Sequence, residues 1–201
     1  MVTVTECTTL GKGRLRFHLD NGTELVLYRG EAKQFRMREG STLSDEEEHQ
    51  LIYEVVGKRA KRRTMHLLEQ MDRTEQQLRE KLKQGGYPQA CIDLALEYVK
   101  SFHYVDDYRY ACTYINYRQD RMSRYQLKVK LYGKGVSGKL IDRALEECYE
   151  GDEQDQIIRL LEKKKFDAQN SDPKEFTRVY QYLMRRGFRS NDVLRAMKSK
   201  Q

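Results

Sequence analysis

The chain has 201 residues, of which 38% are hydrophobic and 34% are charged, and its net charge is +7. This length is enough for a core in one large domain or two small ones, but the low hydrophobic fraction favours an elongated or thin body over one globule. We find no signal-peptide pattern and no apolar run long enough to cross a bilayer, so we expect a soluble, cytoplasmic protein with no membrane partner.

The positive charge is concentrated after residue 50. Residues 1–50 contain 7 basic and 9 acidic residues, whereas the rest of the chain contains 31 basic and 22 acidic residues. A basic segment of this size indicates an acidic or polyanionic partner, although basic residues are also ordinary solubilising surface. Charge alone does not decide between these two explanations.

Residues 2–40 are expected to form a small antiparallel sheet of three or four strands. Hydrophobic residues alternate with a period of two near Val2, near Phe17 and at Leu25–Leu27. The sequence Asp-Asn-Gly at residues 20–22 is a hairpin signal between the second and third runs.

Further turns and connections complete this N-terminal region. Gly11–Gly13 supplies a turn between the first and second runs, and Gln34–Met37 is expected to be a fourth strand. Ser41–Leu43 is expected to be a short connection to the helices. Because so few strands are rarely stable alone, the sheet is expected to pack on the first helices.

The first helix is predicted to begin at a capping box. Ser44 caps the first amides, and Glu47, three residues later, reaches back to the start of the helix. Hydrophobic spacing continues the helix to Leu68, with a bend expected near Gly57. The basic run Lys58–Arg63 on this helix is either a solvated face or a contact for phosphates or carboxylates.

The rest of the chain repeats one helix–glycine–helix pattern three times, at intervals of 49 and 52 residues. In each copy two apolar residues four apart lie on one helix face, a glycine ends the helix, and apolar residues follow at fixed offsets. Such a repeat predicts an array of helical units that bury their apolar faces on one another. The repeated positions are Leu78, Leu82, Gly86, Tyr87, Ile92, Ala95 and Leu96, then Leu127, Leu131, Gly135, Val136, Ile141, Ala144 and Leu145, then Val179, Leu183, Gly187, Phe188, Val193, Ala196 and Met197.

Capping residues mark the starts of several predicted helices. They are Thr74, Ser123, Asp172 and Ser190. Asp106 and Asp107 precede a further helix. Two adjacent carboxylates are compatible with a metal site or an acid pair, but here we expect one to cap the helix and the other to complement its dipole.

The expected fold is mainly α. We predict an elongated, curved, tandem array of three three-helix repeats with a small N-terminal antiparallel β segment. The β segment is placed at residues 1–43, and the repeats are placed at residues 44–104, 105–151 and 152–201.

Reactive side chains are scattered through the chain. Cys7, Cys91, Cys112 and Cys148 form no CxxC motif and have no histidine nearby, so we interpret all four as small buried hydrophobes. We find no Walker loop, no metal-spaced His/Cys cluster and no nucleophile–base pair. We therefore expect a non-enzymatic protein with no catalytic residues, no bound metal and no cofactor.

Partner binding is expected on the basic surface of the last two repeats. Basic residues of the middle repeat follow one another around two successive helices, so we expect one continuous stripe. Arginine forks on such a stripe match carboxylates and phosphates. The candidate residues are Arg118, Arg121, Arg124, Lys128, Lys130, Lys134 and Lys139 in the middle repeat and Arg185, Arg186, Arg189 and Arg195 in the third.

Four groups of residues can be compared with known families. They are Arg73-Thr74…Leu78…Leu82…Gly86-Tyr87, Tyr104-Val105-Asp106-Asp107-Tyr108…Ala111, Leu131…Lys134-Gly135-Val136 and Leu183…Arg186-Gly187-Phe188…Asp192-Val193. Together they resemble the RecX family, and the resemblance covers essentially the whole chain. Two positions depart from the family pattern: Gln77 stands where glutamate is favoured, and Met122-Ser123 stands where a glycine is usual.

The resemblance implies tandem three-helix repeats and no catalytic activity. It also implies a monomer that binds in the groove of a RecA–single-stranded-DNA filament and inhibits the strand exchange, ATP hydrolysis and co-protease activities of RecA. A chain of this kind would act in DNA repair, recombination and the SOS response.

The residues themselves leave two other functions open. The helix pairs could bind single- or double-stranded DNA directly, with some of the 14 tyrosines stacking on unpaired bases. The array could also be a scaffold for an unrelated partner. Steep salt dependence of binding to bare DNA would favour direct binding, whereas inhibition of recombinase ATP hydrolysis well below one protein per monomer would favour RecA regulation.

Overall fold

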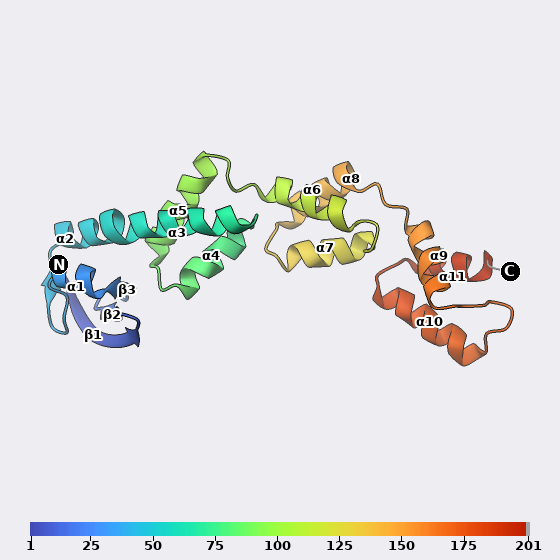
Figure 1. Ribbon diagram of the computed structural model, residues 1–201, viewed down its shortest axis with the longest axis horizontal. Coiled ribbons are helices and arrows are strands. Elements are labelled where there is room, and N and C mark those ends of the chain that lie inside the picture. The colour runs from blue at the N-terminus through green and yellow to red at the C-terminus, as the bar shows by residue number, and fades with distance from the viewer. Residues whose placement is uncertain (200–201) are drawn as a thin grey trace. The chain divides into compact units, whose positions relative to one another are not determined.

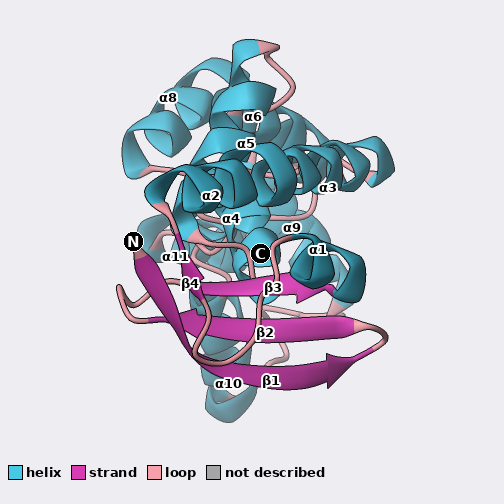
Figure 2. Cartoon of the chain, turned by 90° about the vertical axis from the view of Figure 1, so that its left-hand side faces the viewer, coloured by secondary structure: helices cyan, strands magenta, loops and turns pink. Residues whose placement is uncertain are grey.

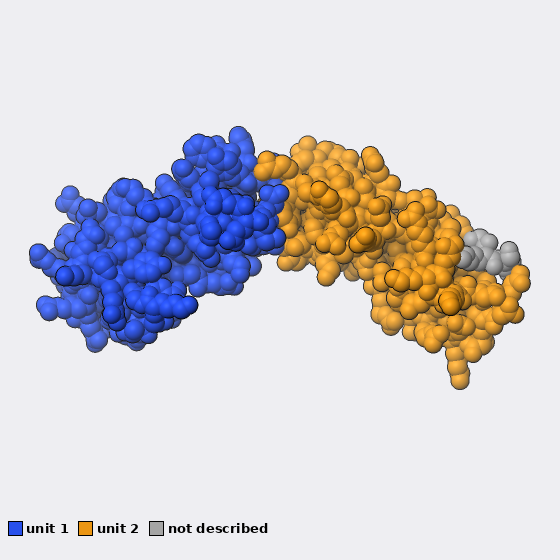
Figure 3. Space-filling view, in the orientation of Figure 1, with its two compact units in different colours: residues 1–106 blue, residues 107–201 orange. Residues whose placement is uncertain are grey.

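The structure is a computed structural model, and it describes residues 1–199. The chain divides into two compact units, which meet in the sequence between Asp106 and Asp107 (Figure 3). Within the described residues no helix is both long and apolar enough to span a membrane.

Unit 1 begins with a four-stranded antiparallel sheet (Figure 2). The hairpin turns lie where the sequence predicts them, with Gly11, Gly13 and Gly22 all at positive φ. The strands are β1 (Val2–Gly11), β2 (Arg14–Leu19), β3 (Glu24–Tyr28) and β4 (Thr42–Leu43), in the spatial order β3-β2-β1-β4.

The fourth strand is not where the sequence pattern placed it. The prediction of a strand at Gln34–Met37 is wrong, because this segment ends the helix α1 (Arg29–Gln34). The Met37 amide donates to the Ala32 carbonyl, and this bond closes the helix instead of pairing with a strand. The true fourth strand, β4, lies in the segment expected to be a connection, and it pairs with the start of β1.

The helices of unit 1 complete its core. They are α2 (Asp45–His49), the π-helical segment η1 (Gln50–Val56), α3 (Gly57–Gln70), α4 (Glu75–Gln84) and α5 (Gln89–Ser101) (Figure 1). Strand residues such as Phe17 and Leu25 belong to the same buried cluster as Leu51, Leu78 and Ile92 on the helices. The sheet therefore shares its core with the first repeat, as its small size predicted.

In the described part of the chain, unit 2 consists of six helices in two three-helix repeats. The middle repeat contains α6 (Asp107–Arg118), α7 (Arg124–Tyr132) and α8 (Gly138–Cys148), and the third contains α9 (Glu153–Lys163), α10 (Pro173–Arg185) and α11 (Ser190–Ser199). Each repeat has its own buried cluster: one contains Leu127 and Ile141, and the other contains Leu183 and Val193. The prediction of three three-helix repeats is confirmed.

The repeated positions have the structural role that their spacing predicted. Their apolar side chains are buried in all three repeats, except for the half-buried Tyr87. Gly86, Gly135 and Gly187 have φ values of 76°, 85° and 79°, so each occupies the left-handed conformation after a helix. In the middle repeat the Val136 amide returns to the Leu131 carbonyl at 3.2 Å, which closes the cap.

Most of the predicted helix starts are confirmed. The side chains of Ser44, Thr74, Ser123 and Asp172 each accept a hydrogen bond from the backbone amide three residues later. Ser190 differs, since it is the first residue of α11 and its hydroxyl lies 2.9 Å from that of Tyr180.

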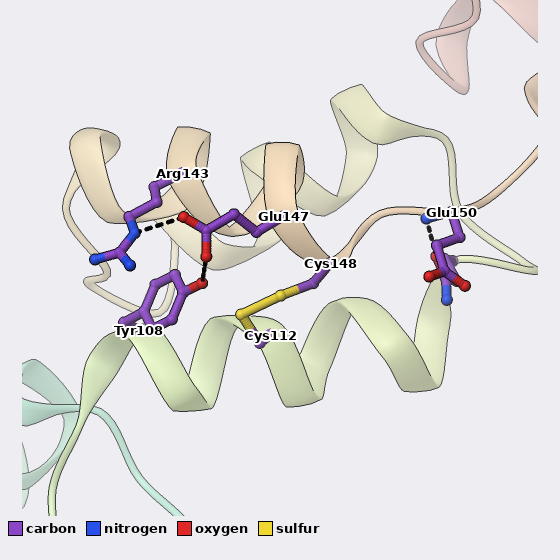
Figure 4. Close-up of a disulfide and its surroundings, with 7 residues drawn as sticks. Tyr108, Cys112, Arg143, Glu147, Cys148 and Glu150 are labelled. Atoms are coloured by element: carbon purple, nitrogen blue, oxygen red, sulfur yellow. Dashed lines mark hydrogen bonds and ion pairs between the residues drawn. A yellow bond between two sulfur atoms is a disulfide. The ribbon is translucent and has the colours of Figure 1, made fainter.

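The interpretation of all four cysteines as separate hydrophobes is wrong for two of them. Cys112 and Cys148 form a disulfide that joins α6 to α8 (Figure 4). These helices pack on each other and bring the two Cα atoms within 5.6 Å, inside the range that a disulfide spans. A separation of 36 residues hides this pairing from any search for short motifs. Cys91 is fully buried, as predicted, and Cys7 is half-buried.

Candidate functional site

The eleven basic residues singled out in the sequence all lie in unit 2. Those of the middle repeat run from the end of α6 through α7 to the start of α8. In the third repeat Arg185, Arg186 and Arg189 lie at the turn between α10 and α11, and Arg195 lies within α11. Nine of the eleven are exposed, and only Lys134 and Arg186 are half-buried. The sequence therefore predicted a set of solvent-accessible cations.

The geometry of α7 divides its basic residues between two sides. Arg124 and Lys128 are four residues apart, so they lie one turn apart on the same face. Because each residue advances the helix by about 100°, Lys130 projects from a different side than Lys128. Arg118 ends α6, and Arg121 lies in the turn between α6 and α7. This turn is followed directly by the start of α7, which carries Arg124 and Lys128.

Some of these cations already have partners. Lys128 forms an ion pair with Asp142 on α8, and Arg195 pairs with Asp192 at 3.4 Å. Three others lie over tyrosine rings: Arg124 over Tyr149, Lys134 over Tyr114 and Arg186 over Tyr182, at 5.9, 5.3 and 4.8 Å from the ring centroids.

The other six have no carboxylate or other side-chain partner within residues 1–199. The charge of a cation that has no partner within the protein is not neutralised, so it can interact fully with an external partner. These six are Arg118, Arg121, Lys130, Lys139, Arg185 and Arg189.

Sequence reasoning missed an exposed apolar face on α7. Tyr125, Val129 and Tyr132 are 60%, 50% and 71% exposed, and their spacing of four and three places them on one side of the helix. The buried Leu127 and Leu131 lie on the opposite side. The signal was present in the sequence, because the same helical spacing that marks the leucines also aligns the tyrosines.

The start of α7 contacts the third repeat, at the start of α9 and at the turn between α10 and α11. The Ser123 hydroxyl donates to the Arg186 carbonyl at 2.5 Å, and the Arg124 amide donates to Glu153 Oε1 at 2.7 Å. The ring of Tyr125 lies over Gly187, where an added Cβ would be 2.2 Å from the ring. These contacts place the start of α7 beside Arg186 and Gly187 of the third repeat.

The described side chains include no candidate metal-binding group. Across residues 1–199 no set of three or more His, Cys, Asp or Glu side chains is arranged to hold a metal ion. The arrangement consists of exposed cations beside an aromatic face, which suits binding and not bond making.

Comparison with known proteins agrees with the repeat architecture. Models of the three RecX three-helix domains match residues 60–98, 106–145 and 151–197, as the first, second and third domains respectively. The three matches together cover more than half of the chain and occur in the expected order. The chain belongs to the RecX family. RecX-family proteins are regulatory proteins and not enzymes.

Several relatives are named regulatory protein RecX. The one from Caldanaerobacter subterraneus subsp. tengcongensis is 28% identical over 163 residues, which are 80% of each chain. The one from Geobacillus kaustophilus is 33% identical over 77% of this chain and 59% of its own length. The one from Clostridium acetobutylicum is 25% identical over 98% of this chain and 94% of its own.

Solved RecX structures share the fold. A crystal structure of regulatory protein RecX superposes with a TM-score of 0.64 at 21% identity, covering 96% of this chain and 97% of the other. The structure of RecX from Lactobacillus salivarius gives a TM-score of 0.63 at 16% identity, over 72% of this chain and 96% of the other. At these identities the likeness concerns the fold alone.

Proposed function

We propose that this RecX-family chain is a cytoplasmic, monomeric regulator that binds the groove of a RecA–single-stranded-DNA filament. In this role it inhibits the recombinase, ATPase and co-protease activities of RecA. The proposal rests on family membership, and the structural observation that supports it is the set of six partnerless cations on unit 2.

The chemistry of these cations suits a nucleoprotein filament. Arginine and lysine side chains without internal partners bind acidic protein surface and DNA phosphate, and both kinds of group are present in such a filament. The fork of Arg121 or Arg189 can bind a carboxylate or a phosphate in a bidentate manner. Lys128 contributes less, because part of its charge is already neutralised by Asp142.

The test is inhibition of the single-stranded-DNA-dependent ATP hydrolysis of RecA. The native chain should inhibit at well below one molecule per RecA monomer. Arg118→Glu with Arg121→Glu should weaken inhibition strongly, because both residues are exposed and partnerless. Lys163→Glu with Lys174→Glu is the matched control, since these lysines are also exposed, partnerless and in unit 2, but lie outside the candidate set.

Two results would count against the proposal. If the native chain leaves ATP hydrolysis unchanged at any ratio, RecA is not its partner. If the control variant loses as much inhibition as the Arg118/Arg121 variant at equal folded stability, the basic surface has been assigned to the wrong residues.

A second candidate function is direct binding of single-stranded DNA. The observation that favours it is the exposed face of Tyr125, Val129 and Tyr132 beside Arg124 and Lys128, because bases stack on exposed tyrosine rings next to cations. Binding of an oligonucleotide without RecA, across a salt series, separates the two functions. Tight binding with a steep salt dependence favours this candidate.

A further inference from the structure

A second concentration of positive charge lies in unit 1, in a pocket of about 400 Å³. Residues of β2, β3, α3 and α4 line it, together with the turn after α4. The lining residues are Arg14, Val26, Tyr28, Arg59, Arg63, Lys81, Gln84, Gly85 and Tyr87. Four of these nine residues are cationic and none is acidic.

Three of the cations have no internal counterion. Arg14, Arg63 and Lys81 come from three different elements, and none of them pairs with a carboxylate within residues 1–199. Cations that line one pocket repel one another. A bound anion would relieve that repulsion.

The fourth cation, Arg59, organises the wall of the pocket. Its guanidinium donates to Glu31 and to the Val26 carbonyl, and its side chain is only 19% exposed. It also lies 5.0 Å from the ring centroid of Tyr28 and 5.4 Å from that of Tyr87. Arg59 is therefore held in place by these contacts, and its guanidinium positions the rings of Tyr28 and Tyr87 at the edge of the pocket.

The Tyr28 ring remains open to solvent although one side contacts Arg59. Tyr28 is 49% exposed, so the contact with Arg59 leaves about half of its surface in solvent. An exposed aromatic face beside cations is the arrangement on which nucleic-acid bases stack.

One feature of the pocket opposes anion binding, but it is weak. Lys81, Gln84 and Gly85 lie at the C-terminal end of α4, where the helix dipole is negative. The carbonyls of Lys81, Leu82 and Lys83 are already bound by the amides of residues 85–87. The three positive charges of Arg14, Arg63 and Lys81 outweigh the partial negative charge at this end of the helix.

We propose that this pocket binds a nucleotide, with its phosphate on Arg14, Arg63 and Lys81 and its base against Tyr28. A free mononucleotide and one nucleotide of a single strand offer the same chemistry. The site belongs to unit 1 and involves none of the eleven basic residues of unit 2. It does not depend on RecA as a partner.

The test measures binding without RecA, by fluorescence anisotropy of a dye-labelled 12-nucleotide thymidine oligomer. Arg63→Glu and Lys81→Glu should each weaken binding by about tenfold and lower the dependence on salt by about one unit of slope. Arg62→Glu is the matched control, because Arg62 is the adjacent residue of α3 and is also exposed, but it does not line the pocket. It should bind nearly as the native chain does.

The tyrosine is tested by a conservative pair of variants. Tyr28→Ala should weaken binding about tenfold, whereas Tyr28→Phe should retain it, because stacking needs the ring and not the hydroxyl. Circular dichroism melts of each variant identify any loss of folding. If Tyr28→Phe binds as weakly as Tyr28→Ala at equal stability, stacking is not involved and the proposal fails.

Competition identifies the source of the nucleotide. Displacement of the oligomer by millimolar AMP indicates a site for single nucleotides, whereas resistance to AMP with sensitivity to Arg63→Glu indicates a site for a strand. Either result supports the proposal. It is overturned if inorganic phosphate competes as well as AMP, or if Arg62→Glu weakens binding as much as Arg63→Glu.

Discussion

Lys165 holds the backbone conformation that usually calls for glycine. Its φ is 53°, and the amides of Lys165 and Phe166 return to the carbonyls of Glu162 and Leu161 to close the end of α9. Arg36 ends α1 in the same way. A side chain in this conformation costs about 1–2 kcal/mol that glycine avoids.

Lys165→Gly should therefore raise the free energy of unfolding of unit 2 by about 1 kcal/mol, after the greater flexibility of glycine in the unfolded chain is subtracted. Urea denaturation followed by circular dichroism measures this change. Lys164→Gly is the control, since Lys164 has a φ of −84° and should lose stability. A lower stability for Lys165→Gly would contradict the expectation.

Burial also sets the ionisation of Cys91. Its thiol is fully buried and lies 3.2 Å from the Ile52 carbonyl, and burial raises its pKa to about 11. The unfolded thiol ionises near 8.5. The folded state therefore keeps the Cys91 proton to a higher pH than the unfolded state does. The stability that this group contributes is complete below about pH 8.5 and is lost as the pH rises toward 11.

The Cys91 prediction has two measurements. Native chain at pH 8 should react with iodoacetamide at Cys7 but not at Cys91, as peptide mass spectrometry can show. Between pH 8.5 and 10.5 the native chain should lose more stability than Cys91→Ala does, since only the native chain can lose this proton. Equal pH slopes for the two chains would refute the expectation.

The residue scale also shows how far the candidate site could be predicted. Exposed cations such as Arg121 and Arg189 could be found from the sequence, because a charged residue on a helix end is almost always solvated. The pairing of Lys128 with Asp142 depends on how α7 and α8 pack, so no local pattern contains it. The contacts of Arg59 also depend on tertiary packing, because its hydrogen bond to the Val26 carbonyl joins α3 to a strand 33 residues earlier in the sequence.

At the scale of elements, Gly187 is constrained in two ways. It has a φ of 79°, and a Cβ built on it would lie 2.2 Å from Cδ1 of Tyr125. Gly187→Ala should destabilise unit 2 by more than about 2 kcal/mol, since the left-handed backbone alone accounts for 1–2 kcal/mol. Chemical denaturation of the variant provides the measurement.

Two further variants separate the two constraints on Gly187. Gly40→Ala keeps a positive φ but meets nothing within 4 Å, so it should cost only about 1 kcal/mol. Tyr125→Ala combined with Gly187→Ala should cost less than the sum of the single changes, because the smaller side chain removes the clash. Strict additivity would show that the ring does not limit the space at Gly187.

The disulfide between α6 and α8 predicts a response to reduction. It closes a loop with a sequence separation of 36, for which chain entropy predicts a stabilisation of about 4 kcal/mol. Reductant should therefore lower the melting temperature of unit 2. In a reducing compartment the chain would have the less stable form, with two free thiols. Cys112→Ser with Cys148→Ser should melt at one temperature with or without reductant. An unchanged melt for the native chain would show that the bond does not form in solution.

Elements differed in how well the sequence predicted them. Helices with caps and repeated apolar positions, such as α4 and α7, were predicted because their signals are local. The two-residue strand β4 was missed, because only its pairing with β1 makes it a strand. Polar and apolar residues alternate at residues 34–37, which is typical of a strand. The hydrogen bond from the Met37 amide to the Ala32 carbonyl instead makes this segment the end of a helix.

At the scale of the whole molecule, the buried clusters divide as the two units do. The cluster of unit 1 joins strand residues to helix residues, whereas unit 2 contains two clusters of its own. A fragment of residues 107–201 should therefore fold, and its helices should melt cooperatively. A fragment of residues 44–106 should not, because Phe17, Leu25 and Leu27 are missing from its core.

Circular dichroism and thermal melts of the two fragments test this difference. Adding residues 1–43 back, as a fragment of residues 1–106, should restore a cooperative transition. A stable, cooperative fold for residues 44–106 alone would show that the first repeat does not need the sheet.

The shared core of unit 1 has a consequence during synthesis on the ribosome. The strands are translated first, but the buried cluster that they share with the helices extends to Val105. At about 5–20 residues per second, the interval between Leu43 and Val105 takes roughly 3 to 12 seconds. For that time the apolar face of the nascent sheet is only partly covered, so it is accessible to a chaperone at the tunnel exit.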